Sequence, residues 1–194
     1  MEILFEVNSL LNSITYILPT GNKSHCWLID CGDVGRIIRN GWAVDGVLLT
    51  HTHLDHIYGL NKLLEYFPFA QIYTNEFGKV ALADPKLNLS KYHDDVEDFV
   101  FNHSDCIQTI SRNDCLRLSG MDIETFFTPG HDPSCISFRI GNDLFTGDSY
   151  IPRISVVANF PHSNKEDAKN SLARLKKMEQ DGCTIHCGHS IQII

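Results

Sequence analysis

The chain has 194 residues, of which 43% are hydrophobic and 21% charged, and its formal net charge is −8. This length suits one well-buried domain better than two, so we expect residues 1–194 to form a single domain. The acidic balance disfavours a broad basic face for nucleic acid or for an anionic membrane. The expected partner is therefore a small molecule.

The amino-terminal segment is apolar but carries Glu2 and Glu6 where a secretory signal would carry Lys or Arg. No uncharged run of roughly 18 residues follows, so no membrane span is expected. The seven cysteines have irregular spacings, which favours reduced thiols over a disulfide framework. We therefore expect a cytoplasmic protein.

Strand-like runs dominate the first 50 residues. Apolar alternation in residues 3–7, 13–18 and 25–29 predicts three strands in a meander. Residues 33–40, which a glycine follows, are typical of a short helix. Residues 46–50 then predict a buried strand.

Helices and strands alternate in the next part of the chain. Residues 57–67 place apolar side chains at helical spacing, residues 71–74 indicate a strand, and residues 76–84 indicate a weak helix. Residues 85–106 have a poor pattern, and we expect them to form a partly helical loop over the surface.

A second group of strands precedes a final helix. Five short strand-like runs are predicted, at residues 106–110, 115–120, 121–128, 135–140 and 143–147. Ser163 and Glu166 have capping-box spacing, and an apolar stripe then runs to Met178. The last predicted strand covers residues 184–187. Strands followed by helices, twice over, predict sheet layers with helices outside.

Four metal-binding side chains directly follow the buried strand. The stretch "HTHLDH" contains His51, His53, Asp55 and His56. Residues two apart on an extended backbone share a face, so the first two histidines can converge on one ion, whereas Asp55 and His56 point elsewhere. A tetrahedral site takes three or four ligands, so two adjacent metals fit better than one. Imidazole with carboxylate suits Zn²⁺, Fe or Mn²⁺.

Three later places repeat an arrangement of apolar strand, glycine and ligand. They are "TPGHD" with His131, "FTGDS" with Asp148 and "CGHS" with His189. A glycine lets the backbone come close to a crowded centre. We therefore expect seven ligands at one edge of a folded sheet.

The carboxy-terminal stretch "CTIHCGHS" has a second interpretation, as an isolated metal knuckle. A strand over residues 184–187 would separate His186 from Cys187, because alternate side chains point to opposite faces. We therefore interpret Cys183, His186 and Cys187 as packing residues. His93 lacks ligand spacing and is left out of the predicted site.

The set "HTHLDH", "TPGHDPS", "FTGDS" and "CGHS" resembles the metallo-β-lactamase superfamily in order and approximate spacing. The resemblance runs from about residue 10 to the end of the chain. It implies an α+β fold, a four-layer αββα sandwich with the metal site at one edge of the two sheets. It also implies two divalent metal ions, with zinc preferred over iron or manganese.

The resemblance further implies the role of each ligand. The first metal would bind His51, His53 and His131, the second would bind Asp55, His56 and His189, and Asp148 would bridge both. Asp30, which closes an early strand, is predicted to orient a ligand imidazole.

Departures within the superfamily narrow the expected chemistry. The ending "CGHS" is similar to glyoxalase II, the hydroxyacylglutathione hydrolase, but only five residues follow His189, so the carboxy-terminal region that binds glutathione in those enzymes is not expected. The bridging Asp148 disfavours a true β-lactamase, and His53 disfavours a flavodiiron protein. The predicted function is a dinuclear hydrolase in which a metal-bound hydroxide attacks an ester, thioester or lactone.

Asp55 is the predicted catalytic residue, which accepts the proton of the nucleophile and returns it to the leaving group. Tyr150, Arg153 and His162 either bind an anionic group or have ordinary surface roles. A phosphodiesterase, a single-iron sulfur dioxygenase and a non-enzymatic metal- or ligand-binding protein stay open as alternatives. A homo-oligomer whose partner subunit walls the site also stays open.

Overall fold

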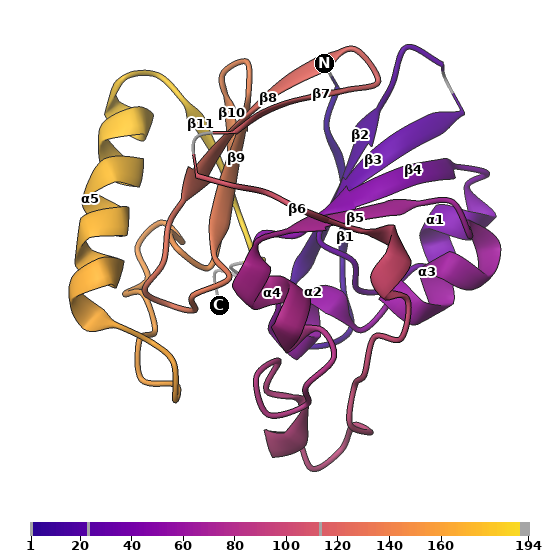
Figure 1. Ribbon diagram of the computed structural model, residues 1–194. Coiled ribbons are helices and arrows are strands. Elements are labelled where there is room, and N and C mark those ends of the chain that lie inside the picture. The colour runs from indigo at the N-terminus through magenta and orange to yellow at the C-terminus, as the bar shows by residue number, and fades with distance from the viewer. Residues whose placement is uncertain (1, 23, 113, 191–194) are drawn as a thin grey trace.

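The computed structural model describes residues 2–22, 24–112 and 114–190. Strands of these residues form two sheets that pack face to face. Helix α5 covers the outer face of one sheet, and α1 and α3 cover the outer face of the other (Figure 1). The four-layer αββα sandwich predicted from the resemblance is therefore confirmed.

The N-terminal sheet has the strand order β1-β2-β3-β4-β5-β6. Its strands are β1 (Leu4–Val7), β2 (Ile14–Pro19), β3 (His25–Ile29), β4 (Ala43–Leu48), β5 (Gln71–Thr74) and β6 (Ile107–Thr109). Strands β1 to β3 form the predicted antiparallel meander, and β3 to β6 run parallel. The carboxyl ends of β3, β4 and β5 consequently lie at one edge of this sheet.

Short helices lie against this sheet. They are α1 (Gly35–Arg39), α2 (Leu54–Ile57), α3 (Leu60–Tyr66) and α4 (Glu76–Ala81). The helix predicted over residues 57–67 is confirmed at residues 60–66 as α3, but it begins three residues later than predicted, because residues 58–59 separate it from α2. The Gly59 N–H donates to the Cys31 carbonyl at 3.0 Å and not to a carbonyl of α2, which interrupts the helical ladder.

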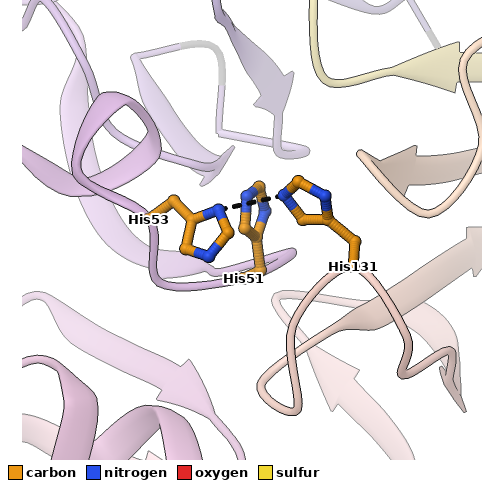
Figure 2. A group of neighbouring side chains, drawn as sticks. All are labelled: His51, His53 and His131. Atoms are coloured by element: carbon orange, nitrogen blue, oxygen red, sulfur yellow. Dashed lines mark hydrogen bonds between the residues drawn. The ribbon is translucent and has the colours of Figure 1, made fainter. Parts of the chain in front are cut away.

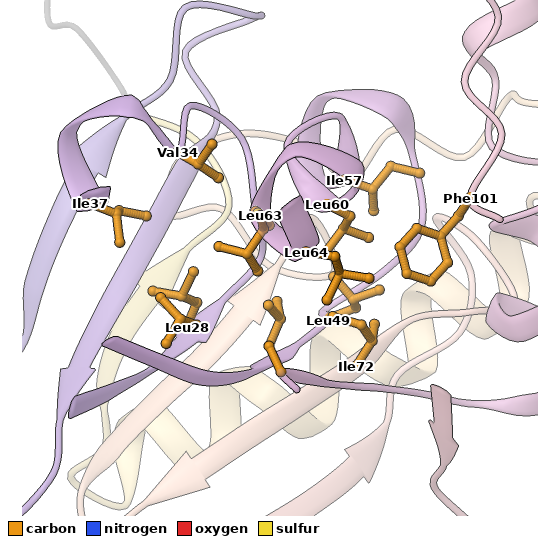
Figure 3. Packing of buried hydrophobic residues seen from close by; sticks show 14 of the residues in the cluster. Leu28, Val34, Ile37, Leu49, Ile57, Leu60, Leu63, Leu64, Ile72 and Phe101 are labelled. Carbon is orange, nitrogen blue, oxygen red and sulfur yellow. The ribbon is translucent and has the colours of Figure 1, made fainter. Parts of the chain in front are cut away.

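The core beneath these helices contains the apolar stripe predicted for α3. Leu60, Leu63 and Leu64 are buried against Leu28 of β3 and Ile72 of β5 (Figure 3). Fully burying one such side chain stabilises the fold by about 1.5–3 kcal/mol. The helical periodicity thus fixes which face of α3 packs on the sheet.

The C-terminal sheet has the strand order β11-β10-β9-β8-β7. Its strands are β7 (Cys115–Leu118), β8 (Met121–Phe127), β9 (Ile136–Ile140), β10 (Asp143–Gly147) and β11 (Thr184–Cys187). Strand β11 joins β10 in parallel, and the other pairs are antiparallel. Between the sheets, Phe138 and Phe145 pack against Ile29 and Leu48.

Helix α5 (Lys165–Gln180) carries the predicted stripe, with Leu175 buried against the C-terminal sheet and Ala168 buried beside Gly130. The predicted cap was wrong by one residue. Asn164 is the N-cap, because its side chain accepts hydrogen bonds from the next helical N–H groups. Ser163 instead donates its hydroxyl to the His131 carbonyl at 2.6 Å.

The long connection between α4 and β6 is the partly helical loop that the weak pattern predicted. It contains two 3₁₀ turns, η1 (Ser90–Tyr92) and η2 (Ser104–Cys106). Asn88, which is fully buried, donates to the carbonyls of Ala81 and Phe99 and accepts from the Ser90 N–H. The Leu54 N–H donates to the Asn88 carbonyl at 2.9 Å, so the loop is joined to α2.

The seven cysteines all lie in the described residues and are free thiols, as expected from their irregular spacing. Among the helices that the structure describes, none is both long and apolar enough to cross a membrane.

Candidate metal centre

The predicted ligands meet at one edge of the two sheets. His51, His53, Asp55 and His56 follow the carboxyl end of β4. The others follow β8, β10 and β11, in connections that reach the same edge. The topology therefore brings together side chains that are far apart in the sequence.

Three imidazoles form the first group. His51, His53 and His131 are buried, and one ring nitrogen from each lies within 4.8 Å of the others. Figure 2 shows the three rings pointing toward one another, with His131 Nε2 at 2.9 Å from His53 Nδ1. This arrangement offers three nitrogen ligands to one ion.

The second group combines a carboxylate with two imidazoles. Asp55, His56 and His189 each place one ligand atom within 4.8 Å of the others. Asp55 Oδ2 lies 3.4 Å from His56 Nε2 and 3.3 Å from His189 Nε2. The two faces predicted for "HTHLDH" are present in part: His53 belongs to the first group and Asp55 to the second, whereas His51 also lies within 4.8 Å of ligand atoms of His56 and Asp148.

Asp148 lies between the two groups. Its Oδ2 is 3.6 Å from His131 Nε2 and 3.2 Å from His189 Nε2, and its Oδ1 is 3.6 Å from His56 Nε2. One carboxylate therefore faces ligands of both groups, which is the placement that a bridging ligand requires.

Backbone carbonyls fix the orientation of two imidazoles. His131 Nδ1 donates to the Val157 carbonyl at 2.8 Å, and His189 Nδ1 donates to the Leu11 carbonyl at 3.0 Å. Each ring then directs the lone pair of its Nε2 toward the centre. Neither contact could be predicted from the sequence, because every residue offers the same backbone carbonyl.

Carboxylates contact two further imidazoles. The Asp30 contact predicted from the sequence is present, with Oδ2 at 2.8 Å from His56 Nδ1. Asp132 was not predicted, and its Oδ2 lies 3.4 Å from His53 Nε2. Burial alone would raise the pKa of the Asp132 carboxyl, but the His53 imidazole, together with hydrogen bonds from the backbone and hydroxyl of Ser134, lowers it. The position of Asp132 directly after His131 was the available signal.

Unpartnered polar atoms show that the centre fits a cation. His51 Nε2 and Asp148 Oδ1 are buried and have no hydrogen-bond partner among the described residues. Burial, together with the neighbouring imidazoles, lowers the pKa of His51 well below its usual 6.5. A neutral imidazole with a free lone pair is a metal ligand.

The electrostatics of the carboxylates lead to the same conclusion. Burial alone would raise the pKa of Asp148, but the hydrogen bond from His189 and the nearby imidazoles lower it below the usual range. Burial alone would lower the pKa of His56, but the charges of Asp55 and Asp30 raise it to about 10. Buried carboxylates require compensating positive charge, and a metal ion supplies it.

The glycine predicted to allow a close approach does so at one position. A Cβ at Gly188 would lie 2.3 Å from Asp148 Oδ1 and 2.9 Å from His56 Cε1. Gly130 has a φ of 134° and packs against the backbone of α5 at Ala168, so its close contact is with this helix. Gly147, the third glycine of the prediction, lies against Thr50. Of the three, Gly188 is therefore the one whose close contacts are with predicted ligands.

The three residues after Asp148 that the sequence singled out lie outside the centre. The Tyr150 hydroxyl donates to Glu179 Oε2 at 2.7 Å, and its ring packs with Leu144 and Leu175 under α5. The His162 ring lies 5.9 Å from the ring of Phe77. Neither of these two side chains, nor that of Arg153, is among the described residues that line the cavity at the centre.

A cavity of about 260 Å³ opens at the centre. It is lined by ligands of both groups and by residues from three connections: Leu11, Leu89, His93, Val157 and Phe160. His93, which was left out of the predicted site for lack of ligand spacing, belongs to none of the ligand groups, but its side chain lines this cavity. Its loop has no periodic pattern, so its position at the cavity could not be predicted from the sequence.

The chain matches known proteins over most of its length. The family described as the metallo-beta-lactamase superfamily matches residues 12–189. A hydroxyacylglutathione hydrolase of Aeromonas salmonicida is 28% identical over 178 residues, which are 90% of this chain and 60% of that protein. A probable metallo-hydrolase of Streptococcus pyogenes is 30% identical over 176 residues, 86% of this chain and 74% of that protein.

Solved structures share the fold. The BLEG-1 B3 metallo-beta-lactamase superposes with a TM-score of 0.83 at 20% identity, covering 98% of this chain and 92% of that one. TTHA1623 in a di-iron-bound form superposes with a TM-score of 0.79 at 21% identity, covering 97% and 92%. At these identities the likeness concerns the fold alone.

Proposed function

This chain belongs to the metallo-β-lactamase superfamily, and on that premise we propose that it is a dinuclear metal-dependent hydrolase of esters, thioesters or lactones. The observation that carries the proposal is Asp148, whose two oxygens face ligands of both groups. A site built for one ion would not need a carboxylate shared by two complete sets of ligands.

We assign the residues to two ions as the resemblance to the superfamily implies. His51, His53 and His131 would hold the first, Asp55, His56 and His189 the second, and Asp148 both. The nitrogen-rich set favours zinc, with iron or manganese as the other candidates. When bound, the two ions would supply Lewis acidity and lower the pKa of a water molecule from 15.7 to about 7.

Asp55 is the residue that we assign to proton transfer. Its Oδ2 faces His56 and His189, and its side chain also lines the cavity that a substrate would enter. A carboxylate that lies beside both metal and substrate can accept the proton of the attacking water and return it to the leaving group.

The curated relatives support hydrolysis of a small molecule. One is named a hydroxyacylglutathione hydrolase and another a probable metallo-hydrolase. A single-iron sulfur dioxygenase would share many of these ligands, so iron content and oxygen consumption separate it from the dinuclear hydrolase.

Metal analysis tests the proposal. We expect about two ions per chain in the purified protein. His53→Ala and His189→Ala should each bind about one ion, because each variant removes one ligand from one of the two groups. His162→Ala, which removes an imidazole outside the centre, should keep about two. An unchanged metal content in all three variants would refute the ligand assignment.

Turnover is the second part of the test. The metal-loaded protein should hydrolyse thioester, ester or lactone substrates, removal of the metal should abolish the rate, and its return should restore it. Oxygen consumption with a persulfide by an iron-loaded protein, without hydrolysis, would favour the dioxygenase instead.

A further inference from the structure

Apolar side chains surround the cavity at the metal centre. Leu11, Leu89, Val157 and Phe160 line it together with the ligands, and we call these four residues the apolar rim. Leu11 is 56% exposed, Val157 46% and Phe160 37%. Single exposed apolar residues are ordinary, but a cluster of them around a site indicates a binding surface.

The apolar rim is fixed by the contacts that orient the ligands. The Leu11 carbonyl accepts from His189 Nδ1, and the Val157 carbonyl accepts from His131 Nδ1. The ring of Phe160 lies 5.2 Å from that of His53. The positions of these side chains are therefore coupled to the geometry of the metal ligands.

Leu89 is held at the cavity by the long loop after α4. Its φ is 65°, in the left-handed region that a branched residue seldom adopts. The preceding Asn88 is fully buried, and its side chain makes hydrogen bonds to Ala81, Phe99 and Ser90. A strained backbone held by a buried network is typical of functional positions.

The charges around the cavity disfavour an anionic ligand. No Lys or Arg is present among the described residues that line it. Asp94 and Asp95 are exposed and directly follow His93, which lines the cavity. Lys91, two residues before His93, is paired with Asp98 at 2.9 Å. Around the metal ions, an approaching anion would therefore meet acidic residues, and no Lys or Arg among the described lining residues would attract it.

We propose that the substrate places an uncharged, apolar group against this rim, and that anionic thioesters such as those of glutathione are poor substrates. The inference deepens the proposed hydrolase function and rests on it in one respect, because the scissile bond must lie at the metal centre. Burial of alkyl groups would supply the binding energy that an anionic substrate would take from Lys or Arg.

Two thioethers that carry the same hexyl group test the inference without turnover. S-hexyl-N-acetylcysteamine is uncharged and S-hexylglutathione is anionic, and neither can be hydrolysed. In methyl-labelled protein loaded with zinc, the uncharged compound should shift the signals of Leu11, Leu89 and Val157, but not those of Leu4 at the far end of β1. It should also bind about tenfold more tightly than the glutathione compound.

Variants assign the preference to the rim. Phe160→Ser should weaken binding of the uncharged thioether about fivefold through lost apolar contact. Leu11→Lys should reduce the ratio of the affinity for the uncharged thioether to that for S-hexylglutathione about tenfold, because the lysine attracts the anionic compound. Phe69→Ser is the matched control, because Phe69 is 90% exposed and precedes β5 at the opposite edge of the sheet. It should bind both compounds as the wild type does.

The two proposals fail in different ways. Equal or tighter binding of S-hexylglutathione would overturn the proposed preference for an uncharged group, even if thioesters are hydrolysed. Shifts of equal size at Leu4 would overturn the proposed binding at the apolar rim. Absence of turnover on thioesters, esters and lactones alike, with the expected thioether binding, would overturn the hydrolase function and leave the rim in place.

Discussion

Asp30 Oδ2 lies 2.8 Å from His56 Nδ1, and both side chains are buried. Asp30 also accepts hydrogen bonds from the backbone N–H and the hydroxyl of Thr50, at the end of β4 where the ligand stretch begins. The Asp30 carboxylate thus connects the end of β4, at Thr50, to His56 of the second group. Such a contact holds the imidazole in one tautomer and raises its basicity.

Asp30→Asn should weaken binding at the second group. The amide keeps the size of the side chain but loses the charge beside His56, and loss of such a contact costs about 10–100-fold in metal affinity. Zinc affinity by chelator competition measures the effect. Asp45→Asn is the matched control, because Asp45 Oδ1 makes a similar contact to His25 Nδ1 at the surface, at 2.6 Å. Equal losses in both variants would contradict the assigned role.

Metal removal should lower the melting temperature. Asp30, Asp55, Asp132 and Asp148 approach the imidazoles in a largely buried site, so the ions offset charge repulsion in the folded state. A ligand at 100 times its dissociation constant stabilises by about 2.7 kcal/mol, which corresponds to about 5–10 °C for a chain of this size. Calorimetry before and after chelation, and after zinc is restored, measures the shift. Identical melting of the three samples would contradict metal binding to the folded chain.

Gly188→Ala should disrupt the metal centre and spare the fold. The added Cβ would lie 2.3 Å from Asp148 Oδ1, so the shared carboxylate would have to move. We expect about tenfold weaker zinc binding, with far-ultraviolet circular dichroism unchanged. Gly21→Ala is the control, because among the described residues no atom other than those of its chain neighbours lies within 4 Å of a Cβ built there. Zinc affinity equal to that of the wild type would show that the centre tolerates the contact.

The sequence predicted the parts of the site that depend on residue identity and spacing. The residue types alone identify the metal-binding side chains, such as His51, His53 and the predicted ligands after the later strands. The topology then brings these side chains together. The helical stripe of α3 was equally visible, because burial selects apolar residues at a regular period.

What the sequence did not predict acts through the backbone or through irregular segments. The Leu11 and Val157 carbonyls orient two imidazoles, and any residue would offer the same acceptor. Leu89 reaches the cavity from a loop without periodicity. The N-cap of α5 is Asn164 and not Ser163. Both residue types suit an N-cap, and the tertiary hydrogen bond from Ser163 to the His131 carbonyl decides between them.

Asn88→Ala should detach the loop that carries Leu89. The change removes the buried hydrogen bonds to Ala81, Phe99 and Ser90 and leaves their backbone groups without partners. We expect the free energy of unfolding to fall by about 2–4 kcal/mol, as measured in urea. Hydrogen exchange should accelerate across η1.

The control for this variant lies in the same loop. Asn102 is exposed, and Asn102→Ala should change the free energy of unfolding by less than about 0.5 kcal/mol. If Asn88→Ala matched this small effect, the buried amide would not be what holds the loop over the metal centre. If it destabilised the chain but left thioether binding intact, Leu89 would contribute nothing to the rim, because loss of the loop removes Leu89 while Leu11 and Val157 remain on other segments.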